Sequence, residues 1–244
     1  MQLDRLALQL RPRSMAEAGD LGVRLAQASR RDLLRCWLPV WVLTTALALA
    51  TVAWASWLPG LLLFWLKPWL DRTLLQVYAR SAFGQPTRLA DLWRDADVVW
   101  WRGLLHSLTI ARLSPWRAYT APVRQLEGQR GSALRQRVRL LLRGQRGPVS
   151  LAQAAFAQAE AVLVLGAMSG IALALPGVQF GDAMGWWFGD DGLAPAFAAA
   201  LVYALAVAVV EPFHVAAGFT MYLNRRVALE AWDIEQAFRH AFAR

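Results

Sequence analysis

Cysteine is almost absent from this chain, since Cys36 is the single cysteine among 244 residues. A disulfide within the chain and a zinc site built from several cysteines are therefore excluded. The sequence also lacks an HExxH motif, a glycine-rich nucleotide-binding loop and a Ser/His/Asp set within its apolar segments. We accordingly predict no catalytic residue, no metal and no cofactor, and the sequence favours a protein that is not an enzyme.

Charge is missing from long stretches, most clearly from Leu193 to Val210. Hydrophobic residues make up 57% of the chain and 13 residues are tryptophan, yet the formal net charge is +9. The arginines concentrate beside the apolar runs, as they do in the cytoplasmic loops of membrane proteins. The composition therefore predicts an all-α polytopic membrane protein in contact with the lipid bilayer, and it argues against a nucleic-acid partner.

Apolar runs near the spanning length of about 20 residues predict about four transmembrane helices. The first covers 36–58, with tryptophans near both ends, and the last two cover 149–176 and 193–223. The second span stays open between two segments. Residues 61–84, which we favour, follow a Pro-Gly turn but carry three charges near their middle, whereas 98–113 is apolar but short and could lie at the membrane surface.

These spans divide the chain into five parts. They are a cytoplasmic amphipathic segment at 1–35, a helical hairpin at 36–84, a basic cytoplasmic region at 85–148 with an interfacial helix at 98–113, a second hairpin at 149–223 with an acidic external loop at 177–192, and a cytoplasmic amphipathic helix at 224–244. The stretch from Arg112 to Arg146 is rich in arginine, whereas the external loop has three aspartates and no basic residue. This asymmetry predicts that both termini lie in the cytoplasm.

Ionisable residues inside the apolar segments form the candidate site. A carboxylate at membrane depth costs roughly 2.5–3.5 kcal/mol even on the mildest scale, so Glu211 requires a partner or a proton. Counted at ~1.5 Å per residue, several such residues reach overlapping depths. We predict one intramembrane polar cluster in which Lys67 and Arg72 neutralise the acids. Its members are Lys67, Asp71, Arg72, Glu160, Glu211 and His214.

Two further sets of residues are predicted to control packing and docking. A ridge of small residues, Gly166, Gly170 and Ala174, would let another backbone come close, within one subunit or between two. Pro212 cannot donate to the carbonyl of Ala208, so a kink is expected in the last span. A cytoplasmic interface is expected beyond that span, and its residues are Asn224, Arg225, Arg226, Trp232, Asp233 and Glu235.

Several short motifs lie between Trp65 and the C-terminal region. They are Trp65-Leu66-Lys67-Pro68 with Asp71-Arg72, Phe83-Gly84, Leu113-Ser114-Pro115, Gln125-Leu126-Glu127-Gly128, Glu211-Pro212-Phe213, Tyr222-Leu223-Asn224-Arg225-Arg226 and Trp232-Asp233-Ile234-Glu235. Together they resemble a family of bacterial multi-span membrane proteins encoded beside MoxR-type AAA+ ATPases, von Willebrand A-like proteins and transglutaminase-like membrane proteins. The tyrosine expected after Glu-Pro-Phe is His214 here. The resemblance implies an inner-membrane component of an envelope-related system, with an AAA+ ATPase system as a candidate partner.

Two functional hypotheses follow. The first is a non-catalytic inner-membrane scaffold or assembly subunit, in which the polar cluster fixes helix packing and the basic loop docks a cytoplasmic partner. The second is a small proton-coupled transporter or channel subunit that uses Glu211. Replacement of Glu211 by glutamine separates them, because a scaffold should lose stability whereas a transporter should stay assembled and lose pH-dependent flux.

Overall fold

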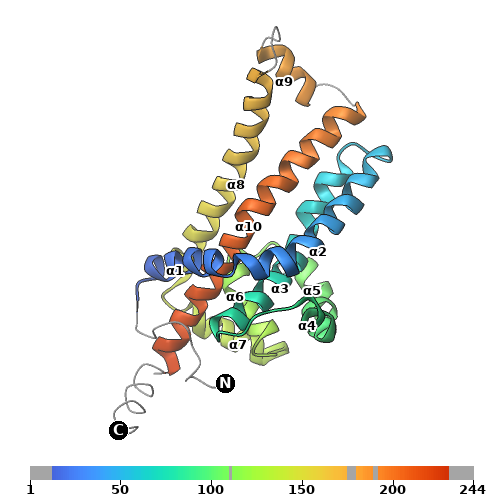
Figure 1. Ribbon diagram of the computed structural model, residues 1–244. Helices are drawn as coiled ribbons and strands as arrows, with labels where there is room; N and C mark the ends of the chain where they lie inside the picture. Colours follow the sequence, from blue (N-terminus) through green and yellow to red (C-terminus); the bar gives the residue numbers. More distant parts are fainter. Residues whose placement is uncertain (1–12, 110–111, 175–179, 189–191, 231–244) are drawn as a thin grey trace.

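The computed structural model describes residues 13–109, 112–174, 180–188 and 192–230. Within these ranges the secondary structure is helical and contains no strand, so the predicted all-α class is confirmed. The helices in chain order (Figure 1) are α1 (Met15–Ala28), α2 (Arg30–Ala50), α3 (Leu58–Ala82), α4 (Leu89–Arg94), α5 (Leu104–Leu108), α6 (Arg117–Gln125), α7 (Gly131–Leu142), α8 (Arg146–Ala174), α9 (Phe180–Phe188) and α10 (Leu193–Glu230). A 3₁₀ turn, η2 (Thr51–Ala53), extends α2, and a π-helical turn, η3 (Asp97–Trp101), precedes α5.

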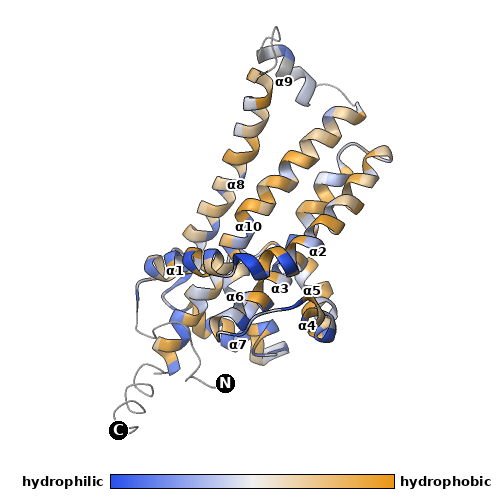
Figure 2. Cartoon of the chain, in the orientation of Figure 1, coloured by the Kyte–Doolittle hydropathy of each residue, from blue (hydrophilic) through white to orange (hydrophobic). Residues whose placement is uncertain are grey.

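Three helices are long and apolar enough to cross a membrane: α2 continued by η2, α8 and α10. Figure 2 shows that their orange, apolar surfaces lie away from the hydrophilic residues that gather around α1, α4 and α7. Large apolar side chains on these helices remain exposed, among them Leu47, Leu173 and Val209. Lipid is the environment in which such exposure is favourable, so the chain is a membrane protein by the length and composition of its helices.

Residues 98–113 do not form the single helix that a membrane span requires. Within the described part of this segment, η3 ends at Trp101, Gly103 has a φ of +77°, and α5 is only 5 residues long. A left-handed residue interrupts an α-helix, so these short pieces remain separate. Of the two segments proposed for a second span, only 61–84 forms one continuous helix, because nearly all of it belongs to α3.

The N-terminal helix ends earlier than expected. A capping box begins the helix: the Glu17 amide donates to the Ser14 hydroxyl at 3.2 Å, and the Ser14 amide donates to the Glu17 carboxylate at 3.1 Å. The amphipathic N-terminal segment was expected to extend to residue 35, but its helix stops at Ala28 and α2 begins at Arg30. At the break, the Ser29 hydroxyl bonds the Ser81 hydroxyl of α3 at 2.7 Å, a contact between residues far apart in sequence.

Two close backbone approaches hold short helices against α10. A Cβ atom at Gly22 would lie 2.4 Å from the Cα of Ala217, and one at Gly218 would lie 2.6 Å from the carbonyl carbon of Ala118. Neither position therefore has room for a side chain. In Figure 1, α1 lies across α10 where α6 approaches it from another side. Consecutive residues of α10 thus anchor both α1 and α6.

The predicted ridge of small residues on α8 is not a crossing point between described helices. A Cβ atom added at Gly166 or Gly170 would meet nothing within 4 Å, and Ala174 is exposed. The lower end of α10 also differs from the prediction. The helix continues through Pro212, passes Asn224 without a break and ends at Glu230. An Arg226–Glu230 pair, four residues apart, stabilises this added turn.

Candidate functional site

The carboxylate of Glu211 lies at the centre of a buried charged cluster. Glu211 is only 1% exposed and belongs to the middle of α10. Its Oε2 atom is 2.7 Å from the Lys67 Nζ atom of α3, and its Oε1 atom accepts a hydrogen bond from the Arg117 guanidinium of α6. Two cations from separate helices therefore neutralise one buried carboxylate, which is the condition for burying it at tolerable cost.

Two further acids share these cations. Lys67 also forms an ion pair with Glu160 of α8, and the Arg117 Nη1 atom is 3.7 Å from the Asp71 Oδ2 atom of α3. The cluster thus links α3, α6, α8 and α10. With all groups ionised, three carboxylates face two cations, so the cluster retains one formal negative charge before His214 is counted.

His214 connects the cluster to α8. Its Nδ1 atom is 2.9 Å from Glu211 Oε1, and its Nε2 atom is 2.9 Å from Gln153 Oε1. An ionised carboxylate only accepts, so Nδ1 carries the proton in that contact. The Gln153 amide has both donor and acceptor groups, so it can bond Nε2 whether or not that nitrogen is protonated. A proton on His214 would cancel the remaining negative charge.

The structure brings together five of the six residues predicted for the cluster: Lys67, Asp71, Glu160, Glu211 and His214. Arg72, the sixth, differs from the prediction. Its guanidinium donates to the carbonyls of Val98 and Arg102, at 2.7 and 2.6 Å, and to the Ser107 hydroxyl at 3.2 Å. Arg72 lies on another face of α3 from Lys67, and it satisfies the backbone around η3 and α5 instead of a carboxylate.

The sequence analysis missed Arg117, because it placed the whole basic stretch around that residue in the cytoplasm and outside the polar cluster. Arg117 is 6% exposed, and burial lowers its pKa while the Glu211 and Asp71 carboxylates raise it, with a net upward shift. The sequence holds no signal for it, because Arg117 is one of many arginines in that stretch. In the structure it belongs to the buried residues of α6, together with Ala118 and Pro122.

A cavity of about 260 Å³ reaches the cluster. Its lining includes Lys67, Glu160, Glu211 and His214, together with Arg112 and Arg117. The volume exceeds that of several water molecules, each of which occupies about 30 Å³ in the liquid. The charged groups therefore border space in which water or a small ion fits.

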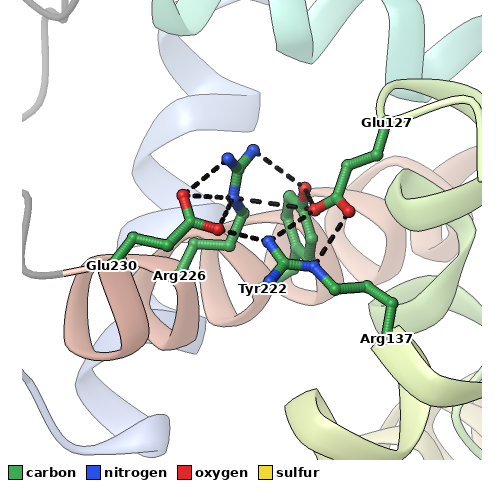
Figure 3. Close-up of polar contacts among 5 residues, drawn as sticks. All are labelled: Glu127, Arg137, Tyr222, Arg226 and Glu230. Atoms are coloured by element: carbon green, nitrogen blue, oxygen red, sulfur yellow. Dashed lines mark hydrogen bonds and ion pairs between the residues drawn. The ribbon is translucent and has the colours of Figure 1, made fainter.

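A second charged cluster holds the lower end of α10, and Figure 3 shows its five residues converging. Arg137 of α7 donates to Glu127 at 2.9 Å and pairs with Glu230. The Tyr222 hydroxyl donates to Glu127 at 2.6 Å, and Arg226 pairs with Glu230 at 2.7 Å. The hydrogen bond to Glu127 raises the pKa of Arg137, so this cation stays charged. We call these residues the Arg137 clamp.

The predicted interface residues at the lower end of α10 make contacts within the chain. Asn224 exchanges hydrogen bonds with the backbone of Arg13, at 3.0 and 2.8 Å, and Arg225 donates to the carbonyl of Arg143 at 2.9 Å. Arg226 belongs to the Arg137 clamp. Trp232, Asp233 and Glu235 lie outside the described residues.

The residues described offer no group of three or more His, Cys, Asp or Glu side chains arranged to hold a metal ion. What the geometry offers instead is a network of paired charges between helices, with an adjacent cavity. No family model, no curated protein and no solved structure matches this chain.

Proposed function

We propose that this chain is a non-catalytic assembly subunit of the bacterial inner membrane, part of an envelope-related complex. In this proposal α3 serves as a fourth span that returns from α2, and both termini lie in the cytoplasm. The charged cluster around Glu211 fixes how the spans pack, and the basic helices below it dock a cytoplasmic partner. An AAA+ ATPase system is the partner that the sequence resemblance suggests.

The observation behind this proposal is the complete pairing of the Glu211 carboxylate with cations. Each carboxylate oxygen of Glu211 has its own cation, and the cations come from α3 and α6. Removal of one member of a buried ion pair typically costs 3–5 kcal/mol, because the partner is left charged and unpaired. Such a cluster favours one arrangement of helices over all others, which is what an assembly subunit requires.

The test replaces Glu211 by glutamine and measures both stability and partner recovery. Glutamine leaves Lys67 and Arg117 with less compensating charge, so we expect a fall of about 3 kcal/mol in the free energy of unfolding. Proteins crosslinked to the wild-type chain in native membranes should be lost in the same proportion. Asp97→Asn is the matched control, since the Asp97 side chain is 71% exposed and its neutralisation should leave both readouts unchanged.

A rescue variant makes the interpretation specific. Glu211→Asp keeps a carboxylate between Lys67 and Arg117 on a side chain one methylene shorter, so part of the stability lost in Glu211→Gln should return. Wild-type stability and partner recovery in Glu211→Gln would contradict the assembly role.

The second candidate function is proton-coupled transport, and the cavity beside the cluster favours it. That cavity touches Glu211 and His214, and His214 has hydrogen-bond partners in both protonation states. In proteoliposomes with an imposed pH gradient, this function predicts flux in the wild type. It also predicts that Glu211→Gln abolishes the flux while the protein remains assembled and thermally stable.

A further inference from the structure

A second cavity, of about 330 Å³, lies between α3, α5, α6 and α7, and its wall is strongly basic. We call it the basic cavity. Six of its lining residues carry basic groups: Arg72, His106, Arg117, Arg124, Arg135 and Arg139. Asp71 is the one acid among the lining residues, and it already pairs with Arg117. The wall therefore has a large excess of positive charge.

These cations are poorly compensated by the protein itself. Among the described residues, no carboxylate lies within ion-pair distance of Arg72, Arg124, Arg135 or Arg139. The buried Nε atoms of Arg72 and Arg117 also have no hydrogen-bond partner within the described chain. The Arg117 side chain is only 6% exposed. Unpaired buried donors of this kind require an acceptor.

Neighbouring titratable groups reflect the same excess of positive charge. Burial and the nearby Arg130 lower the pKa of Arg124. Burial and Arg124 lower the pKa of His106. Burial is the larger cause of both shifts and the neighbouring arginine adds to it, so an anion in the cavity would oppose them.

The basic cavity also has an apolar side. Pro68 and Ala121 line it, as do Leu134 and Val138 of α7. A bare inorganic anion would leave this surface in contact with water. A ligand with a charged group and an apolar portion matches both parts of the lining.

The level of the cavity matches the inner headgroup region. Ala217 lies roughly 36 Å along α10 from Leu193 at ~1.5 Å per residue, whereas a hydrocarbon core is ~30 Å thick. The amphipathic α1 crosses at Ala217, and α6 touches α10 at the next residue. With Leu193 at the outer edge of the core, as in the proposed topology, the α6 and α7 wall of the basic cavity lies near the phosphates of the inner leaflet.

We infer that the basic cavity binds the phosphate group of an anionic phospholipid from the inner leaflet, with the guanidinium groups as donors and the apolar side against the start of the acyl chains. Arginine is suited to this role, since its planar fork pairs with phosphate oxygens in a bidentate manner. The inference does not depend on the assembly function, but the inner leaflet as the source of the lipid rests on the proposed topology.

The test titrates the full chain, purified in a mild detergent, with phosphatidylglycerol or phosphatidylcholine and measures bound lipid by native mass spectrometry. The wild type should prefer phosphatidylglycerol. Arg135 and Arg139 are exposed and have no described ion-pair partner, so Arg135→Gln/Arg139→Gln should fold normally. We expect this variant to bind phosphatidylglycerol about tenfold more weakly. Arg124→Gln is a second, independent variant with the same expected direction.

The matched control is Arg30→Gln/Arg31→Gln, which removes two exposed arginines from the start of α2, outside the cavity. It should bind phosphatidylglycerol like the wild type, whereas general attraction to anionic lipid would weaken it equally. Equal loss in both double variants overturns the inference, and so does equal affinity of the wild type for the two lipids. If inorganic phosphate alone stabilises the protein and displaces phosphatidylglycerol, the site takes a soluble anion and the lipid assignment is wrong.

Discussion

Single glycines decide how closely the short helices approach α10. At Gly22 the obstructing atoms belong to the backbone of Ala216 and Ala217, and at Gly218 they belong to Ala118. Backbone atoms inside helices cannot move aside as the end of a flexible side chain can. A methyl group at either position must therefore separate two helices, with loss of contact along the whole crossing.

The substitution Gly22→Ala tests this at the residue scale. Alanine favours a helix over glycine by about 1 kcal/mol, but overpacking at the crossing should cost about 1–3 kcal/mol. We therefore expect a lower thermal unfolding temperature. Gly19→Ala on the same helix is the matched control, because a Cβ there meets nothing within 4 Å and only the helix preference acts. A higher unfolding temperature for both variants would contradict the close crossing.

Some residues of the Glu211 cluster could be predicted from the sequence, and others could not. Glu211, Glu160 and Lys67 were recognisable, because charges are rare in apolar runs and counting along helices gives their depth. Arg117 was hidden among many arginines, since nothing local distinguishes a buried guanidinium from a solvated one. The sequence around Gly22 and Gly218 likewise gave no signal. Gly166 and Gly170 formed a recognisable motif, but a Cβ added at either would meet nothing within 4 Å in the described chain.

Both buried leucines and ion pairs hold the helix α7 in position. Leu141 and Leu142 are buried at its end, and the Tyr119 hydroxyl donates to the carbonyl of Leu141 at 3.0 Å. Most of the helix surface is otherwise exposed. Leu134 and Val138 pack partly against the core. The Arg137 clamp adds a polar attachment, because Arg137 reaches Glu127 and Glu230 at the same time.

Replacement of Arg137 by glutamine should loosen α7 without unfolding the spans. Two carboxylates would lose their common cation, so local opening should become easier by about 1–2 kcal/mol. Amide hydrogen exchange in residues 131–142 should accelerate accordingly, while exchange in α10 above Gly218 stays unchanged. Arg130→Gln, an exposed arginine at the start of the same helix, serves as the control. Unchanged exchange in Arg137→Gln would assign the position of α7 to its leucines alone.

Element boundaries followed the sequence only where the signal was local. The Ser14 capping box and the apolar runs of α8 and α10 were predictable for this reason. The break at Ser29 was not, because it accompanies a tertiary contact with Ser81 and no proline or glycine marks it. The missing break at Asn224 has the same kind of cause, since the Asn224–Arg13 hydrogen bond and the Arg137–Glu230 ion pair tie that part of α10 to distant segments of the chain.

The whole molecule is longer than a bilayer is thick. At ~1.5 Å per residue α10 extends roughly 57 Å, almost twice a hydrocarbon core of ~30 Å. Figure 1 shows α2 and α3 as a hairpin beside the upper part of α10, while α6 and α7 lie beside its lower part. The arginine-rich helices thus surround the lower end of α10, which the proposed topology places in the cytoplasm.

Cysteine labelling in intact spheroplasts tests this arrangement and the fourth span together. The native thiol provides a silent background, since Cys36 is 0% exposed. A membrane-impermeant maleimide should label Trp57→Cys at the tip of the α2–α3 hairpin and Asp182→Cys on α9 from outside. Ser132→Cys on α7 should react only after the membrane is permeabilised. Trp57 is 65% exposed, so access should not limit its reaction. If Trp57→Cys reacts only after permeabilisation while Asp182→Cys reacts at once, α2 and α3 do not cross, and the chain has two spans, α8 and α10, below which everything else is cytoplasmic.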